Sequence, residues 1–85
     1  MLDLRLMVKF KNKKNLTKIK CSKQDKILLN ILSEEYVPVE IIYVDYINLC
    51  NIECKKNGLF NCYYNDFENL LLKYLKFNII EFNSF

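Results

Sequence analysis

The sequence predicts a small two-layer α+β domain, in which a mainly antiparallel sheet carries two helices on one face in the order β-β-α-β-β-β-α-β. Three observations lead to this class. Residues 2–10 alternate apolar and polar side chains, which is the period of a half-buried strand. Two later stretches instead repeat apolar residues at the helical period. The chain has 85 residues, 52% of them hydrophobic, so residues 1–85 are expected to form a single domain around one core.

The first two elements are predicted to form a β-hairpin. Residues 2–10 place only apolar side chains on one face, and residues 16–21 repeat the alternation. Between them, residues 12–15 have the length and the asparagine content of a hairpin loop. In this pairing the apolar face is buried, and Lys9 lies opposite Lys18 on the solvent face.

A helix is expected to follow the hairpin. Ser22 and Asp25 have the spacing of a capping box, in which the two side chains satisfy free backbone N–H groups at the helix start. The apolar face of this helix is formed by Ile27, Leu28, Ile31 and Leu32. Pro38 disfavours helical backbone at the residue before it, so the helix is predicted to end near Tyr36.

The middle of the chain is interpreted as three strands. Residues 39–47 are β-branched and aromatic, which favours a largely buried strand, although a short helix fits the same pattern. Asn57-Gly58 is a strong hairpin signal, because both residue types tolerate the positive φ of a type I′ turn. This turn is predicted to join a strand at 51–56 to a strand at 59–64.

The last two elements are a helix and a strand. Asn65 and Glu68 have the spacing of a second capping box. The helix that follows has one apolar stripe, made of Phe67, Leu70, Leu71, Tyr74 and Leu75. Lys73 and Lys76 lie near its C-terminal end, where they complement the helix dipole. Residues 78–85 are expected to form the final strand.

The cysteines do not predict a cofactor or a metal site. The chain has four of them, Cys21, Cys50, Cys54 and Cys62, and no histidine. Zinc sites usually contain two closely spaced ligand pairs, and the second pair is missing here. Free cysteines are by default small buried hydrophobic residues. We therefore expect no cofactor and no metal.

The hydropathy pattern predicts no membrane partner. No apolar run approaches the length of a membrane-spanning helix. Residues 1–6 alternate apolar and polar side chains, and no small-residue cleavage site follows, so this stretch is not read as a secretory signal. These observations predict a cytoplasmic protein, in the host-cell cytoplasm if the source is viral.

Charge is distributed unevenly along the chain. Residues 1–26 carry nine basic and two acidic side chains, whereas residues 27–85 carry four basic and eight acidic ones. On the predicted hairpin the basic side chains share one face and its tip, and this candidate binding face consists of Arg5, Lys9, Lys11, Lys13, Lys14, Lys18 and Lys20. Phosphate backbones or an acidic protein surface would complement it. A solvated edge hairpin and a lysine-rich genome composition are the alternative explanations.

A second candidate surface is acidic and aromatic. It consists of Glu34, Glu35, Tyr36, Glu40, Tyr43, Asp45 and Tyr46. Tyrosine next to acidic residues is typical of protein-binding surfaces. Tyrosines that are buried with the hydroxyl at the rim of the core explain the same pattern.

Catalysis is not expected. The chain has no histidine, which is the most frequent general base, and its single glycine excludes a glycine-rich phosphate loop. Asp45 followed by Glu53 and Lys55 on a neighbouring strand resembles the metal site of restriction-endonuclease-like nucleases, where carboxylates hold Mg²⁺. The match is short, and the chain is small for that fold.

The sequence therefore favours a non-catalytic interaction module that binds a larger protein or complex through a surface patch. In size and composition the chain is similar to phage-encoded inhibitors of host defence, anti-CRISPR proteins included. The alternative is a basic nucleic-acid-binding accessory protein of ribosomal or ribonucleoprotein type, which uses the lysine-rich hairpin. Leu29 and Leu72 lie outside the apolar stripes of their predicted helices, and such exposed leucines are compatible with a protein interface or a homodimer.

Overall fold

The structure is a computed structural model, and it describes residues 3–57 and 64–84. Within these residues, three short antiparallel strands form the sheet of an α+β domain. The central strand is β1 (Met7–Phe10), and its two neighbours are β2 (Val37–Pro38) and β3 (Ile80–Asn83). In the register, Val8 lies opposite Val37 on one side and opposite Phe82 on the other. Both edges of β1 are therefore paired.

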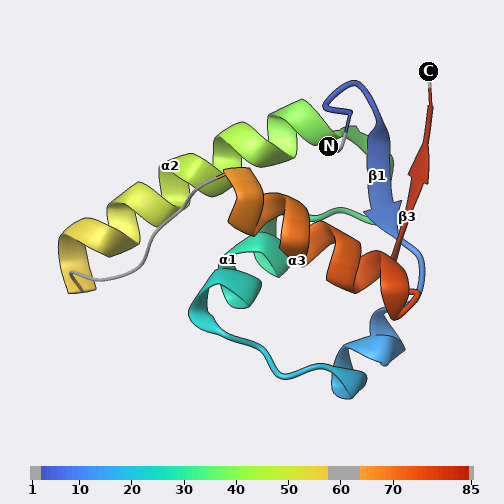
Figure 1. The fold of residues 1–85 in the computed structure, drawn as a ribbon, viewed down its shortest axis with the longest axis horizontal. Coiled ribbons are helices and arrows are strands. Elements are labelled where there is room, and N and C mark those ends of the chain that lie inside the picture. The colour runs from blue at the N-terminus through green and yellow to red at the C-terminus, as the bar shows by residue number, and fades with distance from the viewer. Residues whose placement is uncertain (1–2, 58–63, 85) are drawn as a thin grey trace.

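Three α-helices lie on one side of this sheet (Figure 1), and they are α1 (Lys23–Ile31), α2 (Val39–Asn57) and α3 (Tyr64–Lys76). A 3₁₀-helix, η1 (Lys13–Lys18), connects β1 to the loop before α1. The core lies between the helices and the sheet. Its fully buried side chains come from every layer and include Val8, Leu28, Val39, Tyr46, Phe67, Leu71, Tyr74 and Ile79.

The α+β class and the antiparallel sheet are confirmed, but the predicted order of elements is not, since the described residues contain three strands rather than five. The final strand is confirmed as β3. The first helix is confirmed with its capping box: the Asp25 backbone N–H donates to Ser22 Oγ, and the Ser22 backbone N–H donates to the Asp25 carboxylate. Three α-helices, rather than two, cover the sheet.

The prediction of an N-terminal hairpin is wrong, because residues 13–18 form η1 and not a second strand. The Asn12 side chain caps η1 by accepting from the Lys14 backbone N–H at 3.1 Å. Asn15 holds the turn in place, since its amide donates to the Phe77 carbonyl at 2.9 Å. With β2 and β3 on either side, β1 has no free edge for residues 16–21.

The strands predicted at 39–47 and 51–56 are also wrong, because both stretches belong to α2. For residues 39–47, the helix that also fits the apolar pattern is the element that forms. The start of α2 is fixed by the segment before β1: the backbone N–H groups of Val39 and Glu40 donate to the carbonyls of Leu6 and Leu4. Asn57 ends α2, and residues 58–63 of the predicted hairpin lie outside the described residues. Residue 64, the last of the predicted strand at 59–64, is instead the first residue of α3.

Two helix ends differ from the prediction. α1 ends at Ile31 instead of near Tyr36, and the carbonyl of Ser33 then accepts from the Phe10 backbone N–H at 2.8 Å. The chain after α1 therefore pairs with the end of β1 instead of continuing the helix. At its other end, α3 begins at Tyr64, so Asn65 lies inside the first turn rather than before it.

The link between α3 and β3 is a tight turn at Asn78. This residue has a φ of 58°, in the left-handed region that asparagine tolerates better than most side chains. The backbone N–H groups of Asn78 and Ile79 donate to the carbonyls of Leu75 and Tyr74, which satisfies the free carbonyls of the last helical turn. After this turn, β3 pairs antiparallel with β1.

Candidate functional site

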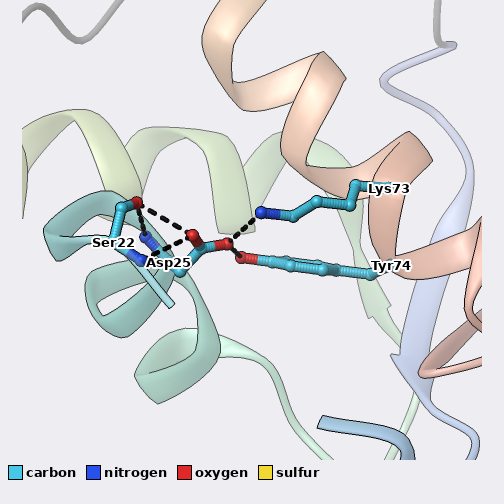
Figure 2. Close-up of polar contacts among 4 residues, drawn as sticks. All are labelled: Ser22, Asp25, Lys73 and Tyr74. Atoms are coloured by element: carbon cyan, nitrogen blue, oxygen red, sulfur yellow. Dashed lines mark hydrogen bonds and ion pairs between the residues drawn. The ribbon is translucent and has the colours of Figure 1, made fainter. Parts of the chain in front are cut away.

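A buried carboxylate joins α1 to α3 (Figure 2). Asp25 is 1% exposed, and its Oδ1 accepts from Lys73 Nζ at 2.8 Å and from the Tyr74 hydroxyl at 2.6 Å. Its Oδ2 accepts from the backbone N–H and the hydroxyl of Ser22, both at 2.8 Å. We call Ser22, Asp25, Lys73 and Tyr74 the Asp25 cluster. Both carboxylate oxygens are fully engaged, so the arrangement is that of a structural anchor.

The electrostatics of the cluster fit this role. Burial alone would raise the pKa of Asp25, but the hydrogen bonds from Lys73, Tyr74 and Ser22 outweigh burial and lower the pKa below its ordinary value. The pKa of Tyr74 is raised, first by burial of the hydroxyl and then by its bond to Asp25. Asp25 therefore stays ionised and Tyr74 stays protonated at neutral pH, which keeps the donor and acceptor roles fixed.

The seven predicted basic residues do not lie on a hairpin, because residues 13–18 form η1. Three of them have acidic partners: Arg5 pairs with Asp3, Lys9 with Glu81 and Lys13 with Glu34. The other four, Lys11, Lys14, Lys18 and Lys20, are exposed and form no ion pair within the described part of the chain. The facing pair of Lys9 and Lys18 does not exist, because residue 18 belongs to η1.

The exposed lysines continue into α1. Lys23 and Lys26 on this helix are also exposed, so residues 11–26 carry seven lysines and a single acid, Asp25, which is buried against Lys73. We call residues 11–26 the lysine segment. Its two ends line different hollows: Lys11, Lys13 and Lys14 lie beside Phe10, whereas Lys23 and Lys26 lie beside Glu53. The segment is a basic band and not the flat hairpin face that the sequence predicted.

Lys9 of the predicted basic face and Tyr36 of the predicted acidic and aromatic surface contact each other and Glu81. The Tyr36 hydroxyl donates to Glu81 Oε1 at 2.9 Å, and Lys9 Nζ lies 3.5 Å from the same oxygen. Lys9 Nζ also lies 4.8 Å from the centre of the Tyr36 ring. The hydrogen bond lowers the pKa of Glu81 and raises that of Tyr36. These contacts join β1 and β3 to the residue that precedes β2.

The rest of the acidic and aromatic set is dispersed. Tyr46 is fully buried and Tyr43 is half-buried, and both rings pack against Phe67 with centroid distances of 5.6 and 5.1 Å. Glu34 pairs with Lys13, and Glu35 is exposed. Glu40 and Asp45 are exposed on α2. Two of the three predicted tyrosines therefore contribute to packing rather than to a binding surface.

The largest exposed apolar feature among the described helices lies on α2. Ile41, Val44, Leu49 and Ile52 are 52, 50, 39 and 49% exposed, and we call these four residues the outer face of α2. The opposite side of the same helix is buried in the core and consists of Val39, Ile42, Tyr46 and Cys50. The exposed polar residues between Ile41 and Ile52 are Asp45, Asn48 and Asn51. Because α2 has apolar residues on two sides and only one side is buried in the core of the domain, the apolar residues of the other side remain exposed.

Sequence reasoning missed this face because it interpreted residues 39–47 as a strand. A strand that is buried on both faces is apolar at every position. Interpreted as such a strand, residues 39–47 contain no side chain that is expected to be exposed. The overlooked signal is length. Residues 39–57 contain neither glycine nor proline, and an uninterrupted stretch of this size favours a helix over a strand.

The described residues contain no group of three or more His, Cys, Asp or Glu side chains that could hold a metal ion. The nuclease-like pattern required Asp45 and Glu53 on neighbouring strands, and both residues instead lie on α2, about two turns apart. Cys50 is a free, fully buried thiol and Cys21 is a free, exposed one. The buried-hydrophobe interpretation is therefore confirmed for Cys50 and is wrong for Cys21.

Comparison with known proteins identifies no relative: no family model, curated protein or solved structure matches the chain. Within residues 3–57 and 64–84, no helix has the length and apolar content needed to cross a membrane. The surface of the molecule, and above all the outer face of α2, is therefore the basis for a functional proposal.

Proposed function

We propose that this chain is a non-catalytic protein-binding module that docks another polypeptide on the outer face of α2. The observation that carries the proposal is the exposure of Ile41, Val44, Leu49 and Ile52 along one side of a helix whose other side already fills the core. Exposed apolar residues that share one face of a helix are typical of interaction surfaces, and here the polar residues Asp45 and Asn48 lie among them. A chain that acts by covering a surface, as a phage-type inhibitor of host defence does, needs such a face.

The energetics support a docking role of moderate strength. Burying the exposed parts of four aliphatic side chains contributes on the order of 4 kcal/mol. Association itself costs several kcal/mol, so this apolar contribution needs complementary polar contacts around it. Asp45 and Asn48, which lie within the outer face, supply an acceptor and an amide for such contacts.

The proposal assigns no reaction to the Asp25 cluster. Asp25 is the buried charged residue of the described core, and its two oxygens already accept four hydrogen bonds. A general base or a metal ligand needs a free lone pair in reach of a substrate. The cluster has the geometry of a helix-to-helix tie instead.

A photo-crosslinking experiment tests the proposal. A benzoylphenylalanine in place of Val44 should crosslink in the native cell to a polypeptide, and the same probe at Leu72 on α3 is the matched control because Leu72 is about as exposed. The double variant Ile41→Glu/Ile52→Glu should remove the crosslink from position 44. Equal crosslinking from positions 44 and 72, or a crosslink that survives the double variant, would contradict docking on α2.

A second candidate function is the binding of a nucleic-acid backbone by the lysine segment, as in an accessory protein of ribosomal or ribonucleoprotein type. Six of its lysines are exposed and form no ion pair with a described residue: Lys11, Lys14, Lys18, Lys20, Lys23 and Lys26. Binding to phosphates by such a band weakens steeply as salt rises, because counterions are released.

The test of this second candidate is a salt titration of binding to generic RNA and duplex DNA. Lys14→Gln/Lys18→Gln/Lys20→Gln should reduce affinity and flatten the salt dependence, and Lys76→Gln at the end of α3 is the control outside the segment. An absence of binding at low salt would reduce the segment to an ordinary solvated surface.

A further inference from the structure

We propose that the polypeptide that docks on the outer face of α2 is a second copy of this chain, with the two α2 helices antiparallel about a two-fold axis. This inference rests on the proposed function, because it names the occupant of the same face.

The spacing of the outer face is the same in both directions. The intervals between Ile41, Val44, Leu49 and Ile52 are three, five and three residues, so the pattern is symmetric about the point between positions 46 and 47. An antiparallel two-fold pairing at this point places Ile41 opposite Ile52 of the second copy and Val44 opposite Leu49. A two-fold interface uses one patch twice and therefore needs a self-complementary patch, and this pattern supplies one.

The polar residues of the face are also self-complementary. The same axis places Asp45 opposite Asn48 of the second copy, and the asparagine amide can donate to the aspartate carboxylate in both symmetric positions. A parallel pairing would instead place Asp45 against Asp45 and repel. The antiparallel arrangement therefore gives Asp45 an amide donor opposite it, which the parallel arrangement does not.

Two further acids of α2 lie level with each other in this pairing, because position 40 of one copy is opposite position 53 of the other. Glu53 lines the hollow that Lys23 and Lys26 of α1 form, so it lies on the side of α2 that faces α1. Glu40 of the second copy is therefore level with a Glu53 that lies off the outer face, beside two lysines of its own chain. At the centre of the face, the two Asp45 residues lie three residues apart along the paired helices, about 4.5 Å, so their repulsion weakens the pairing that the contacts between Asp45 and Asn48 favour.

The size of the face sets the expected strength. α2 has 19 residues and is about 28 Å long, which is enough for a helix pair but provides only two layers of aliphatic contacts on each side of the axis. Interfaces of this small size are weak. We expect a monomer–dimer equilibrium in the micromolar range, in which dilution exposes the face again.

Sedimentation equilibrium on the full chain and three double variants tests the inference. In the antiparallel pair, residue 41 faces residue 52 of the other copy, so Ile41→Lys/Ile52→Glu creates two attractive pairs across the axis. Ile41→Glu/Ile52→Glu and Ile41→Lys/Ile52→Lys create like-charge pairs in either orientation. The attractive variant should dimerise at least about 10-fold more tightly than either like-charge variant. Leu72→Glu, on α3, should dimerise like the parent chain, and circular dichroism checks that each variant is folded.

The outcomes separate this inference from the proposed function. A parent chain that is monomeric up to millimolar concentration, or one whose dimer resists all the charged variants, overturns the inference. A dimer that is lost equally in the attractive and the like-charge variants overturns the antiparallel pairing. If the parent chain is monomeric but position 44 crosslinks to a different polypeptide, the docking function stands and the second copy is excluded as its occupant.

Discussion

The Tyr74 hydroxyl donates a 2.6 Å hydrogen bond to Oδ1 of Asp25, which joins two helices through residues 49 positions apart in the sequence. The same oxygen accepts from Lys73, the neighbour of Tyr74 on α3. Because Asp25 also caps the first turn of α1, a single carboxylate fixes both where α1 begins and where α3 packs. The loss of a partner of this carboxylate therefore affects the packing of both helices.

Removing the Tyr74 hydroxyl should destabilise the fold. Tyr74→Phe leaves the ring in the core but takes one donor from a buried carboxylate, and we expect a loss of about 1–3 kcal/mol in the free energy of unfolding. Urea denaturation measures it. Tyr36→Phe is the matched control, since its hydroxyl binds Glu81 on the exposed side of the sheet, and it should cost clearly less. Equal losses for both variants would contradict a special role for the buried bond.

Stability should fall in acid through Asp25. Its pKa in the folded chain lies below the value of 3.8 expected for an unfolded chain, so its contribution is present above that value and is lost as the pH falls through the folded pKa. The free energy of unfolding should therefore decline below about pH 4. Asp25→Asn should be less stable at pH 7 and show a flatter dependence in this window. An unchanged slope in Asp25→Asn would assign the acid response to other groups.

Alkaline pH tests the Tyr74 hydroxyl, which is the donor in the hydrogen bond to Asp25. The pKa of Tyr74 is raised above the ordinary value of 10.0, so its contribution is present below pH 10 and is lost as the pH rises further. The parent chain should lose stability above pH 10 more steeply than Tyr74→Phe. Chemical denaturation at pH 9 and pH 11 compares the two slopes, and parallel slopes would show that Tyr74 does not titrate with unfolding.

The two described cysteines should respond differently to substitution. Cys50→Ser places a hydroxyl in a fully buried apolar position on the inner side of α2, and we expect a cost of about 1–3 kcal/mol. Cys21→Ser changes an exposed side chain and should leave the free energy of unfolding unchanged. A thiol-reactive probe should likewise label Cys21 in the folded chain and Cys50 only in denaturant. Rapid labelling of Cys50 under native conditions would contradict its burial.

The parts of the fold that depend on local signals could be predicted from the sequence. The capping box of Ser22 and Asp25, the stripe that buries Phe67, Leu71 and Tyr74, and the strand at β3 each follow from residues close together in the chain. The capping box does not reveal that Asp25 also binds Lys73 and Tyr74, because that contact depends on how the helices pack.

The errors arise where tertiary pairing overrides a local pattern. Residues 16–21 alternate like a strand, but β1 is already paired with β2 and β3, and both partners come from distant parts of the chain. Residues 39–47 are apolar on two sides, which hides the helical period that a one-sided helix shows. The outer face of α2 could not be predicted for the same reason, since exposure distinguishes its residues from those of the core.

The pairing of β1 with β3 has a mechanical consequence. The two strands run antiparallel, with Met7 opposite Asn83 at one end and Phe10 opposite Ile80 at the other. A tensile force applied to the two chain ends acts first on the Met7–Asn83 end, so the ladder opens one rung at a time instead of shearing all at once. Pulled from its ends, the domain should therefore yield at low force, with the sheet peeling apart before the helices extend.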